Sequence, residues 1–120
     1  MRLLLYLLVF VTSSCNKQIS DTMPAPTAPK KYYYLALGDS YTIGEKVAPP
    51  DNFPSQLSVL MSNDTVDFQP ARIIAKTGWT TDELEAGIIA ADQQQPLRNS
   101  YDFVTLLIGV NNQYRGRTVD

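Results

Sequence analysis

Histidine does not occur anywhere in this 120-residue chain. Because histidine is the usual general base near neutral pH, a chain without it must use another base, borrow one, or do no chemistry of that kind. There is a single cysteine, Cys15, which excludes an intrachain disulfide and a four-cysteine zinc site. The formal net charge of −2 gives no reason to expect a nucleic-acid partner, since such partners require clustered positive charge.

Long apolar runs are also scarce, and the clearest one lies at residues 3–11. Nine residues are too few to span a bilayer as a helix, which takes about 20. The run follows Arg2 and is followed by small residues, so residues 1–15 are typical of an export signal. Cys15, directly after the small residues, resembles the lipobox of bacterial lipoproteins. That resemblance implies lipid modification of Cys15 and anchoring in the bacterial cell envelope. The alternative is an ordinary signal peptide, an incidental cysteine and a secreted or periplasmic protein.

A proline-rich stretch at residues 16–31 separates this signal from the rest of the chain. Pro24, Pro26 and Pro29 each remove a backbone donor and fix φ, so neither helix nor sheet is expected there. We interpret residues 16–31 as a semi-extended tether and residues 32–120 as a folded domain.

The pattern of residues 32–120 alternates apolar strands with amphipathic helices. Strands are predicted at residues 32–37, 71–75 and 101–108, and helices at residues 55–61 and 80–91. Near-continuous apolar strands alternating with helices indicate an α/β fold of three layers, a parallel sheet covered on both faces.

The two predicted helices have their own sequence signals. In the first, Leu57, Leu60 and Met61 lie on one face. In the second, Thr80 and Glu83 have the spacing of a capping box, in which each side chain satisfies an orphan backbone N–H.

Polar or glycine residues follow each predicted strand. They include Ser40 after the first, Gly78 after the second and Asn111 after the third. Ligands of parallel α/β sheets bind beyond the carboxyl ends of the strands, so we expect these three residues to converge on one edge of the sheet.

Three blocks carry a more specific resemblance: residues 38–42 (GDSYT), Gly78, and residues 109–111 (GVN). Their order and their places at strand ends are similar to those of the SGNH (GDSL) serine ester hydrolases, and the chain resembles the N-terminal portion of that family. The resemblance implies a flavodoxin-like fold and hydrolysis of carboxylic esters or thioesters, as in lysophospholipases and acyl-thioesterases, without a cofactor or metal.

The same resemblance implies a role for each block. Ser40 would be the nucleophile, and its backbone N–H, that of Gly78 and the Asn111 side-chain amide would form the oxyanion hole. Each residue also has a purely structural interpretation: Ser40 as a helix N-cap, Gly78 as a turn glycine, and Asn111 as the residue that ends a strand. Asp39 is expected to brace the turn.

The family's D-x-x-H block has no counterpart here, because the sequence contains no histidine. About three strands are predicted, where the family has about five. The third strand would then be an edge with an exposed apolar face. These departures predict an inactive fragment, because removing the base of a Ser-His-Asp system costs roughly 10⁶ in turnover. Lys46 or Lys76 as a substitute base has no support in the family pattern.

Two other classes of function remain as alternatives. A haloacid-dehalogenase-type phosphotransferase would use Asp39, but it needs a second aspartate where this chain has Tyr41. A non-catalytic, lipid-anchored remnant that binds a ligand without turning it over would fit the missing base.

Overall fold

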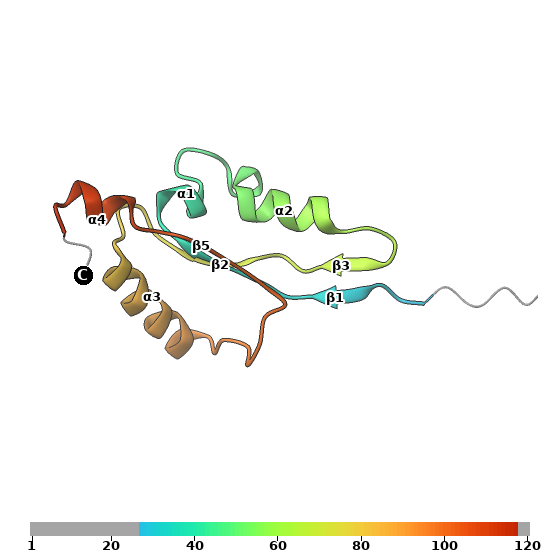
Figure 1. Ribbon diagram of the computed structural model, residues 1–120. Coiled ribbons are helices and arrows are strands. Elements are labelled where there is room, and N and C mark those ends of the chain that lie inside the picture. Colours follow the sequence, from blue (N-terminus) through green and yellow to red (C-terminus); the bar gives the residue numbers. More distant parts are fainter. Residues whose placement is uncertain (1–26, 118–120) are drawn as a thin grey trace, which may run out of the picture.

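The computed structural model describes residues 27–117, which form a three-stranded and a two-stranded parallel sheet, with helices on both faces of the three-stranded sheet (Figure 1). The strands are β1 (Lys30–Tyr32), β2 (Tyr34–Gly38), β3 (Val66–Phe68), β4 (Arg72–Ala75) and β5 (Phe103–Leu107). Strand β2 lies between β4 and β5 and is parallel to both, while β1 pairs in parallel with β3. The α/β class and the three-stranded parallel sheet expected from the sequence are therefore confirmed.

Two longer helices cover opposite faces of this sheet (Figure 1). The helical segments are α1 (Ser40–Ile43), the short 3-10 helix η1 (Pro49–Asp51), α2 (Phe53–Met61), α3 (Thr81–Gln94) and α4 (Val110–Tyr114). The predicted capping box is present, because Thr80 and Glu83 satisfy each other's backbone N–H at the start of α3.

Side chains of β2 alternate between two hydrophobic cores. Tyr34 and Ala36 pack with Phe68 on the face that α2 covers, whereas Leu35 packs with Ile74 and Leu84 on the face of α3. Successive side chains of a strand point to opposite faces, so a strand buried on both faces is apolar at every position. The apolar run at residues 34–37 is thus explained by helices on both sides.

The structure corrects the expected start of the folded domain. Strand β1 begins at Lys30, inside the predicted tether, because Lys30–Tyr32 pairs with β3. Strand β3 itself was not predicted, since three residues are too few to show a period. Residues 1–26, with the predicted signal and most of the tether, lie outside the described residues.

Helix α2 also differs from expectation in the residues that it buries. Leu57 packs against the sheet and Ser58 is buried, but Leu60 is 79% exposed. The last turn of the helix is held instead by Ser62, whose hydroxyl donates to the Ser58 and Phe68 carbonyls at 2.9 and 3.3 Å. The predicted apolar face is therefore only partly used.

Strand β5 is the least buried of the sheet. It pairs with β2 on one side, and no strand among residues 27–117 pairs with its other side. Its exposed apolar side chains are Phe103, Val104, Leu106 and Leu107, which retain 42%, 51%, 64% and 47% of their exposure. This is the apolar edge expected from the sequence.

In the described part of the chain, no helix is long and apolar enough to cross a membrane.

Candidate active site at the carboxyl ends of the strands

The three central strands end side by side. Gly38 at the end of β2 is in register with Ala75 of β4 and Leu107 of β5. The loops that follow these strands therefore leave the sheet at one edge, near α1, α4 and the start of α3 (Figure 1). This confirms the expected convergence of the segments that contain the three candidate site residues.

The loop after β2 turns directly into helix α1. Gly38 permits this turn, because a Cβ there would lie 2.1 Å from Thr42 Oγ1 and 2.3 Å from the Leu107 carbonyl oxygen. Asp39 is the N-cap, and its carboxylate accepts from the Tyr41 N–H at 3.0 Å. Ser40 is therefore the first helical residue and not the cap, so the structure rejects the N-cap interpretation of Ser40. Asp39 does brace the turn, as expected.

Asn111 connects the ends of all three strands. It lies in α4, directly after β5, and its Nδ2 donates to the Trp79 carbonyl oxygen at 2.9 Å and to Asp39 Oδ2 at 3.3 Å. Asp39 is only 1% exposed, so the second bond satisfies a buried carboxylate oxygen. One amide group thus holds together the turn that carries Ser40 and the loop that carries Gly78.

Gly78 lies in the loop between β4 and α3 with a φ of 81°, a conformation that favours glycine. Its carbonyl oxygen accepts from Arg115 Nη2 at 2.7 Å, and the Nη1 of the same arginine pairs with Glu83 at 3.0 Å. Arg115 therefore fixes the loop to both α4 and α3. Both terminal nitrogens of the Arg115 guanidinium thus have a partner.

Helix α4 has two further contacts with the start of α3. The side-chain amide of Asn112 accepts from the Thr81 N–H at 3.0 Å and donates to its hydroxyl at 2.9 Å. Arg117, three residues beyond the end of α4, forms an ion pair with Asp82. Sequence reasoning missed these contacts because the partners are about 30 positions apart and show no local pattern.

The pKa values of the two carboxylates in these contacts are lowered. The Arg117 hydrogen bond, followed by that from Thr80, lowers the pKa of Asp82 far below its usual range. The backbone N–H of Thr80, followed by Arg115, lowers the pKa of Glu83. Both side chains are therefore charged at neutral pH and hold α4 against α3, next to the loop that contains Gly78.

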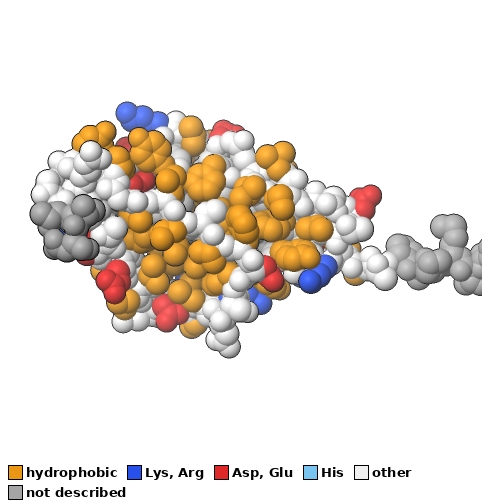
Figure 2. All heavy atoms as spheres, in the orientation of Figure 1, with side chains coloured by type: hydrophobic (Ala, Val, Ile, Leu, Met, Phe, Trp, Pro, Cys, Tyr) orange, Lys and Arg blue, Asp and Glu red, His pale blue; other side chains and the backbone are white. Residues whose placement is uncertain are grey.

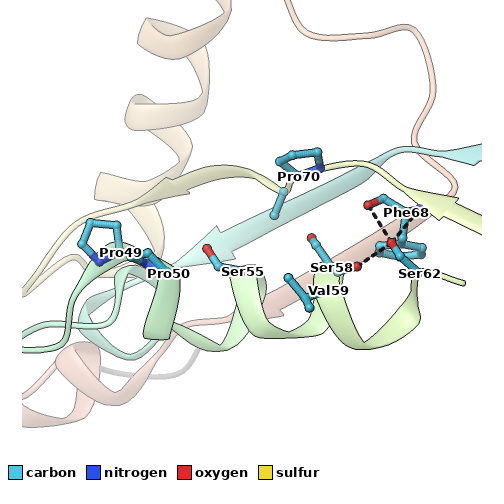
Figure 3. A pocket seen from close by; sticks show the side chains of 9 residues that line it. Pro49, Pro50, Ser55, Ser58, Val59, Ser62, Phe68 and Pro70 are labelled. Carbon is cyan, nitrogen blue, oxygen red and sulfur yellow. Dashed lines mark hydrogen bonds between the residues drawn. The ribbon is translucent and has the colours of Figure 1, made fainter.

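Two aromatic residues near the site differ in role. The Trp79 ring packs in the core with Leu35 and Leu84, and a Cβ at Gly87 would lie 2.2 Å from it. Trp79 is therefore a packing residue. Tyr41 is 63% exposed and helps to line a hollow of about 240 Å³ with Asp39 and Val110. A larger hollow of about 580 Å³ lies along α2 and contains none of the three site residues (Figure 3).

Comparison with known families now identifies this arrangement. Residues 36–120 match the GDSL-like Lipase/Acylhydrolase family, and this match covers most of the chain. The chain belongs to the GDSL-like lipase/acylhydrolase family. The resemblance seen in the three sequence blocks is thereby confirmed.

Solved structures show the same fold. The chain is similar to AlinE4, an SGNH-hydrolase family esterase, with a TM-score of 0.60 and 23% identity. Two single-substitution mutants of that esterase also match with TM-scores of 0.60, at 23% and 22% identity. Each match covers 77% of this chain and 47% of the esterase, so the chain spans about half the length of these relatives. No curated protein matches the chain significantly in sequence.

Residues 27–117 contain no cluster of three or more His, Cys, Asp or Glu side chains able to hold a metal ion. Of the residues predicted to have functional roles, Ser40, Gly78 and Asn111 are brought to one edge of the sheet, and Cys15 lies outside the described residues.

Proposed function

We propose that this chain is the N-terminal part of a serine hydrolase that cleaves carboxylic esters or thioesters, with Ser40 as the nucleophile. The hydrogen bonds of Asn111 to Asp39 and to Trp79 support the proposal most directly, because they link the segments that carry Ser40 and Gly78. The AlinE4 relative is an SGNH-hydrolase family esterase, which supports an ester as the bond to be cleaved.

The oxyanion hole would consist of two backbone N–H groups and one amide. The N–H of Ser40 is at the first position of α1, where a helix offers it no carbonyl partner. In the described loops the N–H of Gly78 donates to no backbone carbonyl either. Both donors are therefore available for the negative oxygen that forms when a serine attacks a carbonyl.

Asn111 would supply the third donor by exchanging one partner. Its two N–H bonds are used in the structure, but the bond to Asp39 is long at 3.3 Å, whereas that to Trp79 is 2.9 Å. If the N–H that donates to Asp39 turned toward an oxyanion, the shorter bond to Trp79 would still hold the Asn111 side chain in place. Each such donor is typically worth about 3 kcal/mol of transition-state stabilisation.

The general base would come from residues outside this sequence, which has no histidine. The base takes the serine proton during attack and returns it to the leaving group. Without it the serine hydroxyl is a weak nucleophile. We therefore expect the 120 residues alone to be an inactive fragment of the hydrolase, and the greater length of the relatives, of which the match covers only 47%, is consistent with this.

Lipid modification of Cys15 would attach this hydrolase to a membrane of the bacterial cell envelope. The apolar run at residues 3–11 and the small residues before Cys15 support this localisation. Stable anchoring takes two acyl chains or an acyl chain with a second signal, because one chain binds only marginally.

The first test is to sequence the gene for about 300 nucleotides beyond codon 120 in all three frames, the span that about 100 further residues of one domain would need. A downstream D-x-x-H block would supply the missing base. A protein extended through that block should react with a fluorophosphonate probe at Ser40, and its Ser40→Ala variant should not. Failure of the extended protein to react would refute the assignment of Ser40 as the nucleophile.

The 120-residue chain is the matched control for that experiment. It should hydrolyse an activated acetyl ester no faster than its own Ser40→Ala variant. Hydrolysis that disappears in Ser40→Ala would show instead that a base is present within the chain, with Lys46 and Lys76 as the candidates. A chain that binds acylated ligands without reaction, and has no downstream block, would support the non-catalytic remnant.

A further inference from the structure

The most exposed apolar residues on α2 are three consecutive side chains at its carboxyl end. Val59, Leu60 and Met61 are 75%, 79% and 48% exposed, and we call them the α2 patch. Contiguous exposed apolar side chains often mark a surface that interacts with another molecule or a membrane. The surface view shows apolar side chains continuing across this face toward the N-terminal end of the described chain (Figure 2).

Hollows flank the α2 patch on two sides. Val59 lines the groove of about 580 Å³ that runs along α2 beside Phe68 and Pro70 (Figure 3). Leu60 and Met61 line a second hollow of about 380 Å³ together with Tyr32 of β1. The patch is thus a ridge between two apolar depressions, and it lies beside the strands at the amino end of the sheet.

We propose that the α2 patch rests on the membrane to which Cys15 is attached, and that the candidate active site consequently faces away from that membrane. The inference rests on the proposed lipid modification of Cys15 and goes beyond it, because it assigns a face and an orientation. Twelve residue steps separate Cys15 from residue 27, and an extended chain of that length reaches about 40 Å at most. A tether of that reach allows the patch to meet the bilayer, and because the described chain enters the domain beside β1, the anchor would be attached to the patch end of the sheet (Figure 1).

The charges around the patch are balanced. Lys30 and Lys31 lie on β1, and Asp67 lies opposite Lys31 on β3, with Asp64 in the preceding turn. These charges neither attract nor repel an anionic surface strongly, so the contact would depend on the apolar side chains. A patch that works together with a covalent lipid needs only a weak affinity of its own, because the anchor supplies a high local concentration.

A second copy of the chain fits the patch less well than a bilayer. Stable protein interfaces bury about 800 Å² per partner, and three side chains on a ridge between hollows cannot supply that area. Lipid acyl chains and headgroups adapt to such an irregular surface. Apolar side chains inserted at the headgroup boundary are the usual means by which peripheral proteins hold one orientation.

This orientation constrains the substrate. The chain enters at β1 and the candidate site lies beyond Gly38, at the other end of the sheet (Figure 1). At about 3.3 Å per residue, the eight residues from Lys30 to Gly38 separate the two ends by about 26 Å. Ser40 would then act on esters that arrive from the aqueous side of the envelope and not on lipids of the supporting leaflet.

The test uses the full chain, lipidated in a bacterial host and reconstituted in vesicles of phosphatidylethanolamine and phosphatidylglycerol. A lipidated Cys15 has its sulfur in a thioether, so a cysteine introduced by Leu60→Cys is the only thiol available for a nitroxide spin label. Tyr114→Cys is the matched control, since Tyr114 is 82% exposed and lies in α4 at the site end. Collision with oxygen, which partitions into lipid, is compared with collision with a water-soluble nickel complex.

We expect the ratio of oxygen to nickel collisions to be several-fold higher at position 60 than at position 114. Equal ratios would overturn the proposal, as would recovery of a protein without lipid on Cys15. A label at position 60 that is shielded from both reagents would indicate a second copy on the patch and would also overturn it. Because no readout involves hydrolysis, the result is independent of whether Ser40 reacts with a fluorophosphonate.

Discussion

Strands β2 and β5 have similar apolar sequences but opposite environments. In β2, Tyr34 and Ala36 retain 1% and 0% of their exposure, whereas in β5 Val104 and Leu106 retain 51% and 64%. The two strands are neighbours in one sheet and are paired residue by residue. The difference shows that strand composition alone does not bury a side chain, because burial depends on having a strand on each side and a helix on each face.

The comparison of β2 with β5 also bears on function, because the candidate site lies at the carboxyl ends of these strands. The turn after β2 carries Ser40, and the segment after β5 carries Asn111, so the buried and the exposed strand each contribute one part of the candidate site. The exposed apolar side chains of β5 make this edge of the sheet suited to pairing or cover by another element.

The largest difference between the two strands should appear in leucine-to-alanine substitutions. Leu35→Ala removes a side chain that packs with Ile74 and Leu84, and we expect it to lower the free energy of unfolding by about 2–5 kcal/mol. Leu106→Ala, on β5, should change it by less than about 0.5 kcal/mol, as for other exposed positions. Urea unfolding followed by circular dichroism measures both. Equal losses would show that β5 is buried in solution, for example by self-association.

The contact between the two strands can be disturbed at Gly38. A methyl group there would approach the Leu107 carbonyl oxygen to 2.3 Å, so Gly38→Ala should push the ends of β2 and β5 apart. Overpacking of this kind costs about 1–3 kcal/mol in unfolding free energy. The matched control is Gly87→Ala in α3, whose added methyl group meets the Trp79 ring at 2.2 Å and has only atoms of that ring as its three nearest neighbours.

Amide resonances distinguish the two glycine variants. Gly38→Ala should shift the signals of residues 103–111, and Gly87→Ala should shift those of α3 instead. A Gly38→Ala variant with unchanged β5 signals would contradict the close approach of the two strand ends.

A smaller effect is expected from the link between Asn111 and the turn after β2. Asn111→Ala removes the donor to Asp39 and to Trp79, and a hydrogen bond contributes about 1 kcal/mol to unfolding free energy. Its main consequence should be faster hydrogen exchange of the Tyr41 N–H in the turn at residues 39–41, because that N–H donates to the Asp39 carboxylate. Asn112→Ala, whose bonds go to Thr81 instead, should leave that turn protected. Equal exchange in both variants would refute the bridging role of Asn111.

The smallest effect concerns the exposed pairs that hold the segment after β5 against α3. The lowered pKa values of Asp82 and Glu83 mean that the charged forms stabilise the folded state. Their contribution is present above the ordinary carboxyl pKa of about 4 and is lost as the pH falls through the lowered folded values. The melting temperature should therefore decline below about pH 4.

Salt and substitution test the cause of that decline. Arg117→Ala removes the main cause of the Asp82 shift, so the dependence on pH should become shallower. High salt should weaken the effect as well, because both pairs are solvent-exposed. An unchanged pH profile in Arg117→Ala would assign the decline to other carboxylates.

Much of the fold could be predicted from local patterns. The capping box at Thr80 and Glu83 lies within four residues, and the apolar runs that became β2, β4 and β5 are each contiguous. The location of the candidate site could also be predicted, because parallel strands place their carboxyl ends at one edge and the three blocks follow those ends. Where sequence reasoning failed, the deciding contact was distant along the chain, as in the pairing of Lys30–Tyr32 with β3 and of Arg115 with Gly78.

By itself, the sequence determined the α/β class, the order of the three central strands and the two longer helices, the three blocks at the strand ends and the absence of histidine. Only the tertiary structure decided which apolar side chains are covered: Leu35 is buried, Leu60 and Leu106 are exposed, and Trp79 packs against Gly87. The physical reason is that apolar periodicity reports a preference for burial, which each residue type has in any context. Actual burial requires a partner surface, and that surface is supplied by segments far away in the chain.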